Sequence, residues 1–117
     1  MDKELKCIEN FKSLMRIAMT SAQHAHDFIF DKSVDEFVAV AYLNVAISKF
    51  SSAESFYYSQ IEILEHSEAE NIFHLFYVFS KEFLNNVRTH HSHQWTDIEF
   101  KRLKEAFDRS AFAFQNH

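Results

Sequence analysis

The sequence predicts an all-α fold, an antiparallel up-down four-helix bundle, from three observations. The 117 residues include no glycine and no proline, so the residues that most often form tight turns and interrupt helices are missing. Apolar residues recur every three or four positions, which lays an apolar stripe along one face of a helix. The pattern of a capping box, Ser or Thr followed three positions later by Glu, occurs at three places: Ser33–Glu36, Ser67–Glu70 and Thr96–Glu99.

Four helices are expected, over about residues 2–30, 34–66, 68–90 and 97–115. The first half of the second helix, Phe37 to Ile47, is apolar nearly all round, which favours a central helix with neighbours on more than one side. Trp95 and Phe100 flank the Thr96 cap as a hydrophobic staple would. The third helix carries its stripe on Ile72, Phe76, Phe79, Phe83 and Val87, and the fourth on Phe100, Leu103, Phe107, Ala111 and Phe114. Short links make neighbouring helices antiparallel.

Composition favours one domain over residues 1–117, with a hydrophobic content of 47% that can form a single core. The lone Cys7 has no partner within the chain, and the N-terminal residues lack the apolar stretch of a signal peptide, so we expect a cytoplasmic protein. The longest apolar run spans only residues 37–47, far short of the roughly 20 that a membrane-spanning helix needs, so no membrane association is expected. A net charge of −5 disfavours strong non-specific nucleic-acid binding.

The predicted topology gathers polar residues at one pole of the bundle. The end of the first helix, the start of the second, the end of the third and the start of the fourth meet there. Histidine, arginine and carboxylate side chains in one region are typical of a functional site, although histidines also favour helix C-termini for electrostatic reasons. The candidate binding residues at this pole are His24, His26, Asp27, His90, His91 and Ser92.

A metal centre at this pole is an alternative, but we expect no resident metal and no other cofactor. The chain has no Glu-x-x-His pair of the kind that holds di-iron centres in helical bundles. His24 and His26 are two residues apart and therefore point to different sides of a helix. Zinc bound by two or three of the histidines together with Asp27 is the metal centre that the sequence still allows.

Arg88 and His93 are the candidate catalytic residues. A histidine can transfer protons near neutral pH, and an arginine can stabilise the extra charge of a pentacovalent phosphate. The two together suffice for metal-independent RNA cleavage by the 2′-hydroxyl. Arg88 is expected in the last turn of the third helix and His93 in the loop that follows, so both could face one cleft.

These residues give the chain a resemblance to HEPN domains, small helical bundles that carry an R-x4–6-H motif late in the bundle. The matching residues are Arg88-Thr89-His90-His91-Ser92-His93, followed by the aromatic Trp95 and the acidic Asp97. The resemblance covers about residues 34–117, and the motif looks similar to that of the subgroup that partners minimal nucleotidyltransferases. It implies a homodimer with a composite site, acting on RNA as a nuclease or as an inactive partner form in a toxin–antitoxin or defence context. Many members place Asn, Asp or His where this chain has Thr89.

A non-enzymatic binding protein is the alternative from a different class. A small acidic helical domain can act as an inhibitor, an immunity protein or a phage-type antagonist that binds a protein partner. Aromatic side chains left on the surface would support this interpretation. Four of them lie partly outside the main stripes and are expected near the surface: Tyr57, Tyr58, Phe73 and Tyr77.

Overall fold

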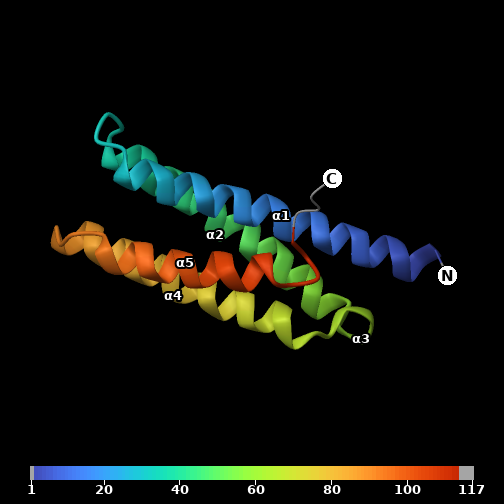
Figure 1. Cartoon of the computed structure of the whole chain (residues 1–117). Helices are drawn as coiled ribbons and strands as arrows, with labels where there is room; N and C mark the ends of the chain where they lie inside the picture. The colour runs from blue at the N-terminus through green and yellow to red at the C-terminus, as the bar shows by residue number, and fades with distance from the viewer. Residues whose placement is uncertain (1, 114–117) are drawn as a thin grey trace.

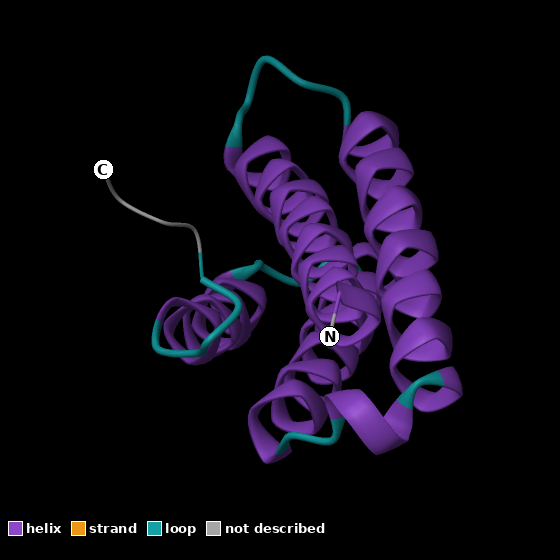
Figure 2. Cartoon of the chain, turned by 90° about the vertical axis from the view of Figure 1, so that its right-hand side faces the viewer, coloured by secondary structure: helices purple, strands orange, loops and turns teal. Residues whose placement is uncertain are grey.

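The computed structural model describes residues 2–113, which form helices joined by short loops and contain no strand (Figures 1 and 2). The predicted all-α class is therefore confirmed. The described residues form five helices where four were predicted: α1 (Asp2–Phe30), α2 (Glu36–Ser59), α3 (Ile61–Leu64), α4 (Ser67–Thr89) and α5 (Gln94–Asp108). None of these helices is both long and apolar enough to cross a membrane.

The four long helices are arranged as two helical hairpins. α1 lies along α2 and α4 lies along α5, and the short helix α3 joins the two hairpins at the end opposite the 31–35 loop (Figure 1). Contacts between α2 and α4 are much less extensive than those within either hairpin. The first half of α2 leaves Phe37, Val38 and Val45 exposed, so the prediction that this apolar half is a central helix was wrong.

Aromatic rings pack both between the two hairpins and within the hairpin of α4 and α5. Phe50 of α2 stacks on Phe76 of α4 with ring centroids 4.0 Å apart, and Phe79 of α4 lies 5.4 Å from Phe100 of α5. Rings in such contact contribute about 0.5–1.5 kcal/mol beyond the area that they bury. The largest side chains with almost no exposed surface include Phe11, Phe79, Phe83, Phe100, Phe107 and Tyr57.

The three predicted caps are each displaced from the residue that the sequence pattern indicated. At α2 the carboxylate of Asp35 accepts from the Phe37 amide at 2.8 Å, while Ser33 bonds to Asp31 within the preceding loop. At α4 the N-cap is His66, whose Nδ1 accepts from the Glu68 amide at 3.1 Å. The carboxylate and the imidazole nitrogen satisfy the same kind of orphan amide that a Ser hydroxyl would.

The third cap is wrong for a different reason, because α5 begins at Gln94 and Thr96 lies inside its first turn. The Thr96 side chain is fully buried. Because the N-cap is His93, Trp95 lies within the helix and not at the N′ position that the predicted hydrophobic staple requires, and its side chain is 59% exposed.

The predicted second helix is interrupted at Gln60 and ends before His66. Tyr57 holds this corner, since its hydroxyl accepts from the His66 amide at 2.9 Å and donates to the Glu70 carboxylate at 2.7 Å. Burial is the main reason that the pKa of Tyr57 is raised to about 12. The phenol therefore stays protonated and can donate to Glu70 at any physiological pH.

The last helix ends at Asp108, earlier than the predicted residue 115. Residues 110–113 turn back toward α1, where the Arg16 guanidinium donates to the carbonyls of Phe112 at 3.3 Å and Ala113 at 3.2 Å. Phe112 is buried against Phe11 with the two ring centroids 5.2 Å apart. The remainder of the predicted helix, including Phe114 and Gln115, lies outside the described residues.

Candidate functional site at the histidine pole

Two loops form the pole at which the sequence placed its candidate site, residues 31–35 between α1 and α2 and residues 90–93 between α4 and α5 (Figure 1). His90 ends α4 with a φ of 58°, in the left-handed region that glycine usually occupies at helix C-termini. The His91 amide bonds to the Asn86 carbonyl at 3.1 Å, which closes the last turn. In a chain without glycine, a histidine takes this conformation.

His26 links the two hairpins at this pole. Its Nε2 lies 2.7 Å from the Asp97 carboxylate of α5, and its Nδ1 lies 3.0 Å from the carboxylate of Asp27. The imidazole also stacks on Phe100 with the ring centroids 4.2 Å apart. Hydrogen bonds from His26 and from Lys101 keep the pKa of Asp97 below its ordinary value of 3.8. His26 therefore joins α1 to α5 by a polar and an apolar contact at once.

His93 is turned inward, against the ends of the helices. Its ring packs between Phe83 of α4 and Phe30 of α1, at centroid distances of 5.6 Å and 6.3 Å. Its Nδ1 lies 3.0 Å from the Thr96 hydroxyl, which also accepts from the Asn86 amide at 3.2 Å. A hydroxyl that accepts from Asn86 can donate to Nδ1, which assigns the proton of neutral His93 to Nε2. Burial lowers the pKa of His93 from 6.5, so the neutral form is favoured.

Arg88 lies on the outer surface of α4, exposed to solvent. Its guanidinium donates to Asn85 at 3.0 Å and borders a surface cavity of about 600 Å³ that Tyr77 and Leu84 also line. Among the described residues no hydrogen bond, ring contact or shared cavity joins Arg88 to His93. The two predicted catalytic residues thus have separate surroundings, one on the surface and one packed against aromatic rings.

The other candidate residues are distributed over several environments. His90, His91 and Ser92 are exposed in the loop between α4 and α5. His24 is also exposed and its ring meets Tyr42 edge-on at 5.6 Å, on a different side of α1 from His26. No group of three or more His, Cys, Asp or Glu side chains within residues 2–113 is arranged to hold a metal ion. The zinc alternative therefore has no ligand set among these residues.

The buried polar pair of Asn86 and Thr96 was not recognised from the sequence. Asn86 donates to the Thr96 hydroxyl from within α4, and its amide also bonds to the Glu82 side chain at 3.0 Å. Two polar residues at core-facing positions, Asn86 following Phe83 and Thr96 preceding Phe100, were the available signal.

Comparison of the chain with protein-family models, with curated proteins and with solved structures finds no match.

Proposed function

We propose that this chain acts by binding a protein partner, as an inhibitor, an immunity protein or an antagonist does, or as the non-catalytic partner form of a HEPN-like domain does. We further propose as its scaffold the antiparallel up-down four-helix bundle of the sequence prediction, in which α3 would be an additional turn between the second and third long helices.

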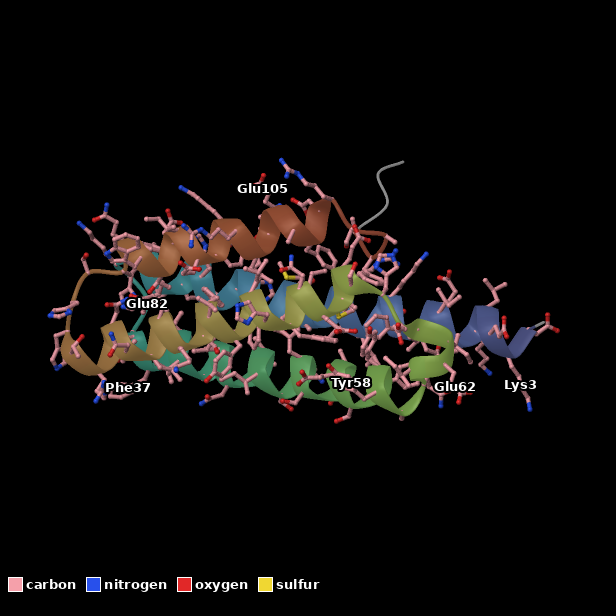
Figure 3. The ribbon with its side chains drawn as sticks, turned by 90° about the horizontal axis from the view of Figure 1, so that it is seen from below. Lys3, Phe37, Tyr58, Glu62, Glu82 and Glu105 are labelled. Atoms are coloured by element: carbon pink, nitrogen blue, oxygen red, sulfur yellow. The ribbon has the colours of Figure 1, made fainter. Side chains whose placement is uncertain are left out.

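One observation carries the proposal, the exposed apolar face on the first half of α2. Phe37 is 80% exposed, and Val38 and Val45 are exposed by 41% and 44%. Figure 3 shows Phe37 near one end of α2 and Tyr58 near the other. No Asp, Glu, Lys or Arg occurs from residue 37 to residue 48, so this face has no charged side chain to keep it hydrated. Burying a phenylalanine side chain is worth about 1.5–3 kcal/mol, which makes Phe37 a strong anchor for a partner.

Charge around this face indicates the chemistry of the partner. Asp31, Asp35 and Glu36 are exposed beside Phe37 at the start of α2, and the whole chain carries a net charge of −5. A complementary partner therefore presents an apolar pocket for Phe37 with Lys or Arg side chains at its rim. Such a rim would accelerate association at low ionic strength.

Affinity capture from the native lysate tests the proposal with matched variants. The wild-type chain and the control Ile17→Ser, which changes another exposed apolar residue, should capture the same protein. Phe37→Ser and Val45→Lys should lose it while keeping an unchanged melting temperature. Equal capture by all four proteins would overturn the proposal, and loss of capture on raising the salt concentration is expected from the acidic rim.

Metal-independent RNA cleavage by Arg88 and His93 is the second candidate function. Its support is that His26, His93 and Asp97 lie at one pole and that the exposed Arg88 is in the last turn of α4, which ends at this pole. The test is incubation of wild-type, Arg88→Ala and His93→Ala proteins with labelled total RNA in EDTA. Cleavage by wild type alone would establish the nuclease, and no cleavage by a folded wild-type protein would exclude it for this chain acting alone.

A further inference from the structure

A second exposed stripe runs along α4, on a face that no helix of the described residues covers. Its residues follow one another at steps of four, three, four, three and four, and all six are exposed: Glu70, His74, Tyr77, Lys81, Leu84 and Arg88. The alternation of steps of four and three is the pattern of the seven-residue repeat with which one helix packs along another. The stripe, here called the α4 seam, extends over 18 residue steps, or about 27 Å at 1.5 Å per residue.

Two cavities border the α4 seam and share Tyr77. One, of about 490 Å³, lies between α2 and α4, with Tyr58 and Glu54 on the α2 side and His74 on the α4 side. The other, of about 600 Å³, follows α4 from Tyr77 to Arg88. Together they leave room beside the seam for side chains that approach from outside the molecule. Tyr77 and Leu84, exposed by 57% and 39%, provide the apolar part of this surface.

The order of charges along the α4 seam identifies its occupant. The acidic residue, Glu70, lies at the N-terminal end of the seam, and the basic residues, Lys81 and Arg88, lie in its C-terminal half. We infer that the α4 seam pairs with the α4 seam of a second copy of this chain, in antiparallel orientation about a two-fold axis at the level of residue 79.

Antiparallel pairing makes the seam complementary to itself. Glu70 of each copy then lies opposite Arg88 of the other, which forms two equivalent ion pairs. Tyr77 of each copy lies opposite Lys81, a combination already favourable within one chain, where the Lys81 ammonium is 5.2 Å from the centre of the Tyr77 ring. Parallel pairing would oppose Glu70 to Glu70 and Arg88 to Arg88 instead. An interface whose two halves are identical is the usual arrangement of a two-fold dimer.

The size of the α4 seam sets the expected strength of the dimer. A strip about 27 Å long and one helix, roughly 10 Å, wide covers about 270 Å² on each copy, or about 540 Å² in total. This is well below the range of about 1,200–2,000 Å² for stable complexes. The dimer should therefore be weak, with a dissociation constant on the order of 100 μM, and its population should depend on concentration.

Sedimentation equilibrium of the full chain over increasing concentrations tests this inference through charge exchange. Arg88→Glu and Glu70→Arg should each weaken the dimer at least tenfold, because each substitution places like charges at positions 70 and 88 opposite each other at both ends of the interface. The double variant should restore the dimer to within a few-fold of wild type, since both ion pairs re-form with their signs exchanged. Restoration by a second charge change is not expected from general destabilisation.

Because Glu70 also accepts from the buried Tyr57 hydroxyl, a second set of variants avoids any effect on folding. Tyr77→Glu and Leu84→Glu should make the chain monomeric, while the matched control Ile17→Glu on α1 should leave the dimer intact. A wild-type chain that stays monomeric at several hundred micromolar would overturn the inference. So would a dimer that Val45→Lys abolishes and Tyr77→Glu does not, because its interface would then be the α2 face.

Discussion

Replacing Phe79 by Ala should lower the free energy of unfolding by about 3–5 kcal/mol. Phe79 has no exposed surface, and its ring lies 6.1 Å from Phe76, 5.9 Å from Phe83 and 5.4 Å from Phe100, measured between centroids. These neighbours belong to α4 and α5, which hold each other in place, so the cavity is not expected to collapse. The loss therefore falls in the usual range for a fully buried phenylalanine.

The same loss can be expressed as a melting temperature. An unfolding entropy of about 2.1 cal/mol/K per residue gives about 0.25 kcal/mol/K for this chain, so 3–5 kcal/mol corresponds to a decrease of about 12–20 °C. The matched control is Phe37→Ala, which should change the melting temperature by about 2 °C or less because Phe37 is 80% exposed. Thermal unfolding followed by circular dichroism measures both. A loss for Phe79→Ala no larger than that for Phe37→Ala would refute the burial described for Phe79.

Three further predictions concern the pole. Thr96→Val should cost about 1–3 kcal/mol in a urea titration because it leaves the Asn86 amide and His93 without their shared hydroxyl, whereas Thr96→Ser should retain most of the stability. Because the pKa of His93 is lowered from 6.5, its contribution to stability is present above pH 6.5 and should be lost as the pH falls from 6.5 toward the lower pKa of the folded state. Melting temperatures of the wild-type protein and of His93→Gln between pH 7.5 and pH 5 measure this loss. Parallel curves for the two proteins would contradict the prediction. The pKa of Asp97 is lowered below 3.8 by hydrogen bonds from His26 and Lys101, so its contribution is present above pH 3.8 and lost at lower pH, and Asp97→Asn should flatten the acid limb of the stability curve.

The sequence predicted where helices occur better than where they begin and end. The first helix has the predicted bounds of residues 2–30, because its stripe is uninterrupted. Capping patterns were less informative, since several polar residues near each start compete for the same amides. Asp35 caps α2 in place of Ser33, because the Ser33 hydroxyl donates to Asp31. The spacing of a capping box does not predict this contact within the loop. The buried Thr96 accepts a hydrogen bond from Asn86, ten positions away, and lies inside the first turn of α5. The helix therefore begins at Gln94, earlier than the predicted residue 97.

The gathering of polar residues at one pole followed from topology, but the roles of these residues did not. The predicted antiparallel order brings His26 to Asp97 across 71 residues of sequence. The direction in which each side chain points depends on its place around its helix. The sequence prediction did not include this direction for Arg88 and His93. Arg88 follows the exposed stripe of α4, whereas His93 is held inward by the Thr96 hydroxyl and by two phenylalanine rings.

The four aromatic residues expected near the surface divide in the same way. Tyr58 and Tyr77 are exposed by 54% and 57%, as predicted, but Tyr57 is fully buried and Phe73 is only 8% exposed. Tyr57 tolerates burial because its hydroxyl has partners in His66 and Glu70, and that corner does not exist until α3 turns the chain. Adjacent tyrosines in the sequence thus serve opposite purposes, one in the core and one beside the α4 seam.

An apolar segment such as residues 37–47 has two physical solutions, burial within its own chain or burial against another molecule. The apolar sequence pattern is the same in both cases, because it shows only that burial of the segment is favourable and not which surface buries it. The geometry distinguishes them: α2 packs closely against α1, contacts α4 far less, and leaves Phe37 exposed at an end rich in carboxylates. An exposed phenylalanine among charges contributes little to the stability of the monomer, so a partner that binds it gains most of its hydrophobic free energy. That difference is why Phe37→Ser should abolish partner binding while the chain remains as stable as before.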